Sequence, residues 1–230
     1  MHADTAPGTG LRPELSEAQE DYLKQIFLLG EGEARVSTQT LAERLEVRPA
    51  SVSGMITRLS ELGLVAHTPY RGFGLTAAGR RVALEMLRHH RLLEAFLVRE
   101  LGYHWDEVHD EAERLEHVIS ERFEARIAEA MGHPTHDPHG DPIPCRDLRM
   151  PNGTRTAPPD AFPAGARATL ARVGAQDPAS LAAAERLGLT PGVVVVVLEP
   201  GADPVLLEVA GEKVEVPADL AHSLCLEGPG

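Results

Sequence analysis

Apolar residues in the first third of the chain recur every three or four positions, which is the period of an amphipathic helix. The first such segment starts after Ser16, a residue type that caps helix N-termini, and ends near Gly30. Residues 38–45 and residues 51–62 repeat the period on a shorter scale. The triplet Arg48-Pro49-Ala50 between them predicts a tight turn, so the two segments together predict a helix-turn-helix.

The pattern then changes to the alternation of a hairpin before it returns to helices. Residues 64–67 and 74–76 alternate around a turn at 68–72, which predicts a wing beside the helix-turn-helix. Thr76 is then the expected N-cap of a long helix over 77–101. Its apolar face is broader than one helix needs, and residues 105–131 predict one further helix to pack against it. Proline, glycine and aspartate end the helical pattern at 132–144.

The last third of the chain has a different character. Residues 150–164 are polar and rich in proline, as is typical of a linker. Beyond them the sequence predicts strands at 168–173 and 193–198, a helix at 178–187, and a hairpin of 204–209 with 213–216 around Gly211. These elements indicate a small, mostly β unit of SH3-like size.

Charge limits the classes of partner. The 230 residues carry a formal net charge of −13, which excludes non-specific nucleic-acid binding over the whole surface. Residues 35–81 are the exception, with seven arginines against three glutamates. There is neither a run of 18 apolar residues nor a start typical of a secretory signal, so we expect a cytoplasmic protein without a membrane segment.

The second helix of a helix-turn-helix places its N-terminal side chains at base edges in the major groove. In this chain that stretch carries small and hydroxyl side chains, which allow close approach and can bond to bases or phosphates. The start of the preceding helix offers hydroxyls and N–H groups to a phosphate. The candidate DNA-binding residues are Pro49, Ala50, Ser51, Ser53, Gly54, Thr57 and Arg58 on the second helix, Ser37, Thr38 and Gln39 at the first, and Arg71 at the wing tip.

Two later segments carry imidazoles and carboxylates at helical spacing. Residues three and four apart share a helix face. The first face holds His90 and Glu94, and the second holds His109, Glu113, Glu116 and His117. Packing of the apolar stripes on these helices would bring both polar faces together, and Asp21 could add a carboxylate.

The donor types indicate which metal such faces would bind. Imidazole nitrogen and carboxylate oxygen without thiolate favour Mn2+, although Zn2+ and Fe2+ stay open. Binding should weaken as pH falls through about 6.5, because histidine ligands must be neutral. We expect His133, His136 and His139, in contrast, to lie in a surface loop.

The DNA-binding motif and the metal-binding faces together predict a metal-gated transcription factor, and two other functions compete with it. A metal held by histidine and glutamate could activate water, which would make the protein a hydrolase. The chain has no nucleophile motif that supports this function. The second alternative is a winged-helix regulator that is indifferent to metal, with acidic faces that are only solvated.

Seven motifs, in order, resemble the DtxR/MntR family of metal-dependent repressors over residues 15–148. The tail, residues 165–227, resembles the SH3-like (FeoA-type) domain of the longer members at Leu189-Thr-Pro-Gly192 and Asp219-Leu-Ala-His222. The seven stretches are Glu20-Asp21-Tyr22-Leu23, Leu41-Ala-Glu-Arg-Leu45, Pro49-Ala-Ser-Val-Ser53, Tyr70-Arg-Gly72, His90-Arg-Leu-Leu-Glu94, Glu116-His-Val-Ile-Ser120 and Gly140-Asp-Pro-Ile-Pro144.

The resemblance implies a mainly α fold with a small β domain, and a homodimer that binds an inverted-repeat operator. The implied segments are a flexible arm (1–14), a winged helix-turn-helix domain (15–76), a helical metal-binding and dimerisation domain (77–149), a linker (150–164) and an SH3-like β-barrel (165–230). The implied function is repression of manganese uptake genes by the metal-loaded protein. An Fe2+-responsive repressor is the alternative within the family.

The resemblance also distributes the metal ligands over two neighbouring sites. One site takes Asp21, Glu113, Glu116 and His117, and the other takes His90, Glu94 and His109. Iron-sensing members have Met and Cys at the positions of Asp21 and Glu113, so the acids here imply Mn2+, with Fe2+, Co2+, Cd2+ or Zn2+ as substitutes.

One position departs from the manganese pattern. Two-metal manganese sensors have a glutamate where this chain has Lys24, and a protonated lysine cannot be a ligand. Long iron-type members complete their second site from the SH3-like domain, so Asp177 is a candidate extra ligand. The number of ions per chain stays open between one and two.

Overall fold

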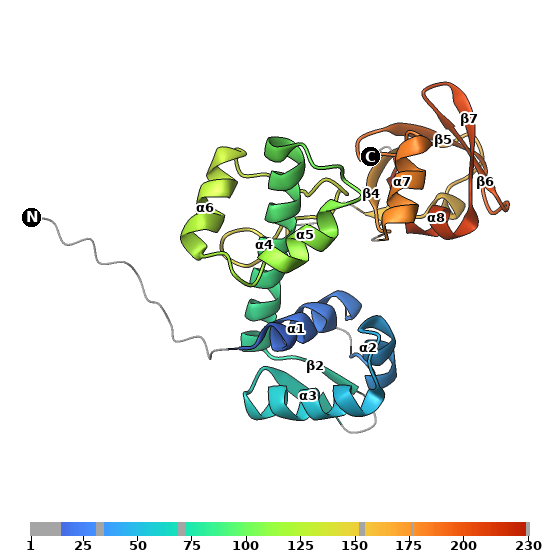
Figure 1. Cartoon of the computed structure of the whole chain (residues 1–230). Helices are drawn as coiled ribbons and strands as arrows, with labels where there is room; N and C mark the ends of the chain where they lie inside the picture. The colour runs from blue at the N-terminus through green and yellow to red at the C-terminus, as the bar shows by residue number, and fades with distance from the viewer. Residues whose placement is uncertain (1–14, 31–34, 69–71, 152–154, 176, 229–230) are drawn as a thin grey trace, which may run out of the picture. The chain divides into compact units, whose positions relative to one another are not determined.

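The computed structural model describes residues 15–30, 35–68, 72–151, 155–175 and 177–228. The chain forms two compact units, Met1–Met86 and Leu87–Gly230, and helix α4 begins in the first and ends in the second (Figure 1). The predicted arm at 1–14 and Arg71 lie outside the described residues.

The first unit contains the predicted helix-turn-helix and wing. Ser16 and Gln19 form a reciprocal capping box at the start of α1, so the predicted N-cap is confirmed. Strands β1 and β2 pair antiparallel from Val65↔Leu75 to Thr68↔Gly72. The elements are α1 (Glu17–Leu29), α2 (Thr38–Arg44), α3 (Pro49–Glu61), β1 (Val65–Thr68) and β2 (Gly72–Leu75).

Helix α3 begins two residues earlier than its apolar pattern predicts. Arg48 is the extended N-cap and Pro49 is the first helical residue. Proline suits this position because its fixed φ is helical and the N–H that it lacks would have no partner inside the helix. The turn therefore ends before Pro49, and the predicted turn residues Pro49 and Ala50 belong to the helix.

The helices of the second unit differ from the prediction in one respect. Thr76 accepts a hydrogen bond from the Gly79 N–H (3.1 Å) and so caps α4 (Ala77–Leu101), as predicted. The single helix expected at 105–131 is wrong, because the chain forms α5 (Val108–Leu115) and α6 (Glu121–Ala130). Ser120 is extended and accepts the Phe123 N–H, so its side chain caps a new helix.

Two arginines of α4 hold the irregular segment 141–144 against the helix. Arg88 donates to the Pro144 carbonyl oxygen (2.7 Å), and Arg91 donates to the Pro142 carbonyl oxygen (2.7 Å) and to Asp141 (3.0 Å). Proline carbonyls that face a buried guanidinium keep their hydrogen bonds without regular secondary structure. This segment is therefore fixed in place next to α4.

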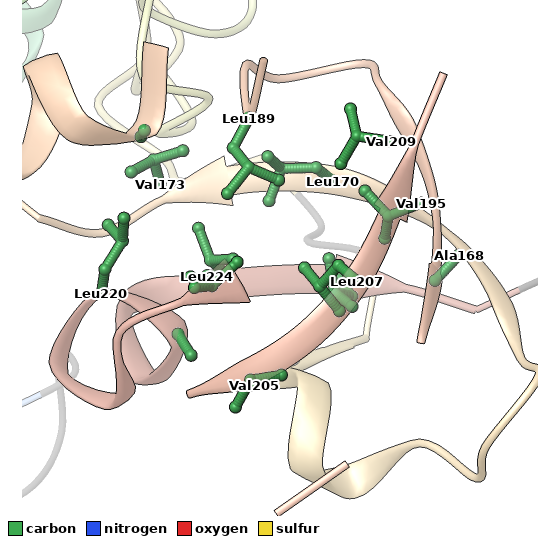
Figure 2. Packing of buried hydrophobic residues seen from close by; sticks show 14 of the residues in the cluster. Ala168, Leu170, Val173, Leu189, Val195, Val205, Leu207, Val209, Leu220 and Leu224 are labelled. Carbon is green, nitrogen blue, oxygen red and sulfur yellow. The ribbon is translucent and has the colours of Figure 1, made fainter. Parts of the chain in front are cut away.

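The C-terminal part is one antiparallel sheet of six strands in the order β3-β8-β4-β5-β6-β7. Leu170, Leu207 and Leu224 have no solvent exposure and point into its core (Figure 2). The elements are β3 (Thr156–Ala157), β4 (Arg167–Val173), α7 (Pro178–Arg186), β5 (Val194–Glu199), β6 (Val205–Val209), β7 (Glu212–Val216), α8 (Ala218–Ser223) and β8 (Leu224–Glu227), with a short 3-10 helix at Pro159–Ala161.

The pattern of this domain predicted only part of the sheet. The hairpin around Gly211 is confirmed, with Ala210 and Gly211 both at positive φ (52° and 87°), as a tight two-residue hairpin turn requires. The prediction missed β3, β8 and α8. These elements have two, four and six residues, too few for a period to stand out.

The sheet domain packs against the segment that follows α6. The Val173 N–H donates to the His139 carbonyl oxygen (2.9 Å), and Arg172 donates to Asp141 (3.1 Å). Gly140 lies between these contacts at φ +88°, and a Cβ there would overlap the Ala171 carbonyl oxygen. Close approach of two backbones therefore requires glycine at this position.

None of the helices in the described part of the chain is long and apolar enough to cross a membrane.

We expect Gly140→Ala to lower the free energy of unfolding by about 2–5 kcal/mol. An alanine in the left-handed backbone conformation costs about 1–2 kcal/mol, and the overlap of its Cβ with the Ala171 carbonyl adds about 1–3 kcal/mol. Gly132→Ala is the matched control, since Gly132 also has positive φ (71°) but no atom within 4 Å of its Cβ position. Urea unfolding of both variants in chelator measures the difference. Equal losses in the two variants would contradict the packing argument.

Candidate metal centre

Three predicted ligands converge at the junction of α4 and α5. His90 and Glu94 lie one turn apart on α4, and His109 reaches them from α5. His90 Nε2 lies 3.0 Å from Glu94 Oε1 and 3.1 Å from His109 Nδ1, and His109 Nδ1 lies 3.2 Å from the same Glu94 oxygen. The three donor atoms thus form a nearly equilateral triangle.

The triangle has the dimensions of one face of an octahedral metal site. Two ligand atoms that stand at right angles around an ion, each about 2.1 Å from it, lie about 3.0 Å apart. Two histidines and one carboxylate on one face leave the remaining positions of an octahedral ion open to other ligands. The residues therefore fit a divalent cation, and His90, Glu94 and His109 are the residues that would hold it.

A buried carboxylate orients His90 for this role. His90 Nδ1 lies 2.6 Å from Glu116 Oε2, and Glu116 is only 1% exposed. A neutral His90 that donates from Nδ1 to Glu116 has its lone pair on Nε2, which faces Glu94 and His109. Metal-binding histidines are commonly held in this way, because the second hydrogen bond fixes both the tautomer and the ring orientation.

Glu94 is ionised in this environment. Burial alone would raise the pKa of its carboxyl, but the charge of a protonated His90 and hydrogen bonds from His109, His139 and His90 hold that pKa well below its ordinary value. The Glu94 oxygen is therefore anionic before a cation binds, whereas the imidazoles must give up these protons and become neutral to act as ligands.

The other predicted ligands lie in three places. Glu113, with 45% of its side chain exposed, has a carboxylate oxygen close to ligand atoms of His90 and Glu116. His117 Nε2 lies 3.5 Å from Glu116 Oε1. Asp21 lies on α1 in the first unit, apart in sequence from the ligands of the second. That Asp21 binds the same metal ion as Glu113, Glu116 and His117 stays a prediction.

Asp177 caps a helix in the structure. Its carboxylate is the N-cap of α7 and accepts the Ser180 N–H (2.8 Å), and the side chain is exposed. This backbone hydrogen bond lowers the pKa of Asp177. Among the described residues, Asp177 belongs to none of the groups with clustered ligand atoms.

The expected surface loop of histidines is right for His133 and His136 but wrong for His139. His139 is 6% exposed, bonds the Trp105 carbonyl oxygen through Nε2 (2.7 Å) and places Nδ1 3.7 Å from Glu94 Oε2. Burial alone would lower its pKa, but Glu94 raises it to about 9. The irregular segment around His139 has no periodic pattern that predicts this burial.

The predicted DNA-binding residues of α3 share one exposed face. Val52, Ile56 and Leu59 are buried against the first unit, whereas the seven candidates between Pro49 and Arg58 are exposed. Gly54 has no atom within 4 Å of its Cβ position, so packing inside the chain does not require a glycine there. At the start of α2, Ser37 accepts the Thr40 N–H (3.0 Å), Gln39 bonds Glu43 (2.7 Å), and Thr38 is half-buried.

Comparison with known proteins identifies the class of this chain. The iron-dependent repressor IdeR of Mycobacterium leprae is 33% identical over 93% of this chain and 98% of its own length. The chain belongs to the DtxR/MntR family of metal-dependent repressors. Members bind DNA and dimerise, and they are not enzymes, so the hydrolase alternative is removed.

Family models match the repressor in three consecutive parts. Residues 14–73 match the N-terminal DNA-binding domain of iron-dependent repressors, residues 76–145 match their metal-binding and dimerisation domain, and residues 160–228 match the FeoA domain. The winged helix-turn-helix and the SH3-like domain are thereby confirmed as family features.

Two solved structures resemble the whole repressor. A manganese-dependent transcriptional repressor in complex with manganese is 40% identical, with a TM-score of 0.85 over 92% of this chain and all of that chain. ScaR with bound Cd2+ is 30% identical, with a TM-score of 0.79 over 92% of this chain and 99% of its own. Both structures resemble this chain in sequence as well as in fold.

Asp177→Ala should lower the free energy of unfolding by about 1 kcal/mol, the usual contribution of a helix N-cap, and leave Mn2+ affinity unchanged. Thermal unfolding and isothermal titration with Mn2+ measure the two quantities. Asp177→Ser provides the control, because serine also caps helices but is a poor metal ligand. A fall in Mn2+ affinity in both variants would instead make Asp177 a ligand.

Proposed function

We propose that this protein is a homodimeric repressor that binds its operator when loaded with Mn2+ and thereby represses manganese uptake genes. The observation that carries the proposal is the convergence of His90 Nε2, Glu94 Oε1 and His109 Nδ1 within 3.2 Å of one another. Among the described residues, no cysteine joins these donors, and nitrogen and oxygen donors suit Mn2+ better than softer ions.

Relatives support both manganese and its alternative. A similar solved structure is named as manganese-dependent, whereas the Mycobacterium leprae relative is named as iron-dependent. The donor set favours manganese only by ligand hardness, so Fe2+ is the second candidate. Co2+, Cd2+ and Zn2+ are substitutes that the same donors can bind, and the similar ScaR structure holds Cd2+.

A second group of ligands would link metal binding to the DNA-binding unit. In the metal-loaded protein, Asp21 of α1 joins Glu113, Glu116 and His117. Because Asp21 belongs to the first unit and the others to the second, such a bridge restricts the motion of one unit against the other. Metal then favours DNA binding to the extent that it prefers the bridged state.

The DNA-binding surface is the exposed face of α3, supported by the N-terminus of α2 and by the wing. A twofold-symmetric dimer presents two such helices, so its operator is an inverted repeat. The domain boundaries proposed for this arrangement are residues 15–76 for DNA binding, 77–149 for metal binding and dimerisation, and 165–230 for the SH3-like domain, after a linker at 150–164.

His109→Gln should weaken Mn2+-dependent DNA binding at least about tenfold, because it removes one corner of the donor triangle. His109 suits the test because its side chain is 25% exposed, whereas Glu94 is buried. The control is Glu111→Gln on the same helix. The measurement is fluorescence anisotropy of a duplex selected from random sequences with Mn2+, at fixed salt, in chelator and then with Mn2+, Zn2+ or anaerobic Fe2+.

The outcomes separate the candidate functions. Tight binding by the wild type with Mn2+, and much weaker binding with Fe2+ at equal free concentration, supports the manganese repressor. The reverse order makes the protein an iron sensor. Equal binding in chelator shows a regulator that is indifferent to metal.

Gly54→Ala should weaken DNA binding at least about tenfold while raising the free energy of unfolding by about 0.5–1 kcal/mol. The stability gain is expected because the glycine lies inside an exposed helix with empty space around its Cβ position. The loss of DNA affinity is expected if the DNA occupies the space around the Gly54 Cβ position. Arg58→Ala is the positive control for lost DNA contact, and Arg126→Ala, an exposed arginine on α6, is the negative control. Unchanged affinity in the more stable Gly54 variant would rule out close contact at this position.

A further inference from the structure

Trp105, the only tryptophan of the chain, lies in the loop between α4 and α5 but packs into the sheet domain. It is 7% exposed and belongs to the same buried cluster as Leu170 and Leu224 of the sheet core. The indole Nε1 has no hydrogen-bond partner among the described residues, so packing rather than a side-chain hydrogen bond holds the ring in place. Trp105 is therefore an apolar anchor between the helices and the sheet domain.

The same residue holds His139 by two contacts. The Trp105 carbonyl oxygen lies 2.7 Å from His139 Nε2, and the two rings stack with their centroids 5.3 Å apart. A carbonyl only accepts, so His139 Nε2 carries a hydrogen and Nδ1 is the nitrogen left for other contacts. The His139 carbonyl oxygen in turn accepts the Val173 N–H of β4 (2.9 Å). Trp105 and β4 together fix the ring and the backbone of His139.

The remaining nitrogen of His139 faces Glu94. Nδ1 lies 3.7 Å from Glu94 Oε2, whereas Oε1 of the same carboxylate is a corner of the donor triangle. The Asp137 carboxylate lies close to the same two residues. If His139 were displaced, Glu94 would lie beside another acid without the imidazole that now faces its second oxygen. The position of His139 thus bears on where Glu94 directs Oε1.

The sheet core also reaches α4 next to Glu94. Val98 lies one turn after Glu94 and packs both against the sheet core and against the core of the helices. Among the described residues of 155–228, none belongs to a group with clustered ligand atoms. The contact of the sheet domain with the metal centre therefore consists of packing and of His139 rather than of a ligand.

We propose that Trp105 is a positioning residue, which makes the Mn2+ affinity of the donor triangle depend on the docked sheet domain by holding His139 against Glu94. This inference rests on the proposed function, because it concerns the triangle of His90, Glu94 and His109. The coupling is reciprocal, so metal bound at the triangle favours the docked sheet domain by the same free energy. The sheet domain thereby takes part in metal binding without supplying a ligand.

The test is a double-mutant cycle on Mn2+ affinity, measured by isothermal titration of the full chain. The binding step that His109→Gln weakens identifies the triangle. Trp105→Ala and His139→Phe should each weaken this step about tenfold, as is usual when a group behind a metal ligand is lost. The double variant should bind no more weakly than either single variant, because Trp105 acts through His139. Trp105→Phe should retain most of the affinity, since it keeps a stacked ring and removes only an N–H without a partner.

A matched control separates positioning from a loss of stability. Leu207→Ala opens a cavity in the same core, but it lies on β6, which is not a neighbour of β4 in the sheet. Its Mn2+ affinity should equal that of the wild type although its free energy of unfolding falls. The emission maximum of the single tryptophan verifies that the sheet domain of His139→Phe stays docked. If circular dichroism shows that Trp105→Ala does not fold, Trp105→Leu replaces it, because leucine is apolar but cannot stack.

The outcomes separate this inference from the proposed function. Wild-type affinity in Trp105→Ala, or losses that add up in the double variant, overturn the positioning role, while a weakened His109→Gln still supports the triangle. Equal losses in Leu207→Ala and Trp105→Ala also overturn it, because destabilisation would then explain both. If His109→Gln binds Mn2+ as tightly as the wild type, the triangle is not the metal site, and the proposed function and this inference fail together.

Discussion

The contact between His90 Nδ1 and Glu116 Oε2 determines what the rest of the metal centre can do. It joins α4 to the turn after α5, and it leaves the other nitrogen of the ring directed at Glu94 and His109. One histidine thus connects two groups of candidate ligands through its two nitrogens. A change in the position or charge of Glu116 would be transmitted through a single rigid ring to the donor triangle.

The backbone around the centre is held by charged groups rather than by regular secondary structure. Arg88 and Arg91 fix the carbonyls of 142–144 against α4, and Asp141 receives both Arg91 and Arg172. The same segment carries His139, whose side chain lies beside Glu94 and whose carbonyl accepts from the sheet domain. The sheet domain therefore contacts a segment that lies directly beside Glu94, a proposed metal ligand.

Sequence periodicity was sufficient to predict which side chains share one face of a helix. The pairing of His90 with Glu94 follows from spacing alone, and the exposed face of α3 follows from its apolar positions. The approach of His109 to these residues required two helices to pack, which the broad apolar face of α4 indicated only in outline. The spacing of apolar residues did not predict the break between two helices at Ser120. The helical pattern continues on both sides of this residue, and a single capping side chain ends it.

Other features were beyond reach because they depend on tertiary contacts. His139 is buried through the path of an irregular segment held by arginines distant in sequence, and no period describes such a path. Trp105 is buried among side chains of the sheet domain, and no pattern within the helical segments predicts that contact. Asp177 illustrates the opposite case, since its position before Pro178 is typical of a helix cap, a simpler explanation of the carboxylate than a metal ligand.

The different exposure of the proposed ligands bears on how the metal preference of this chain could change. His90 is 6% exposed and contacts two groups of proposed ligands, so a substitution there changes both groups at once and its effects on them cannot be separated. Glu113, with 45% of its side chain in solvent, can be exchanged with little loss of packing. If both bind metal as proposed, a change of preferred ion is therefore easier to accommodate at Glu113 than at the buried His90.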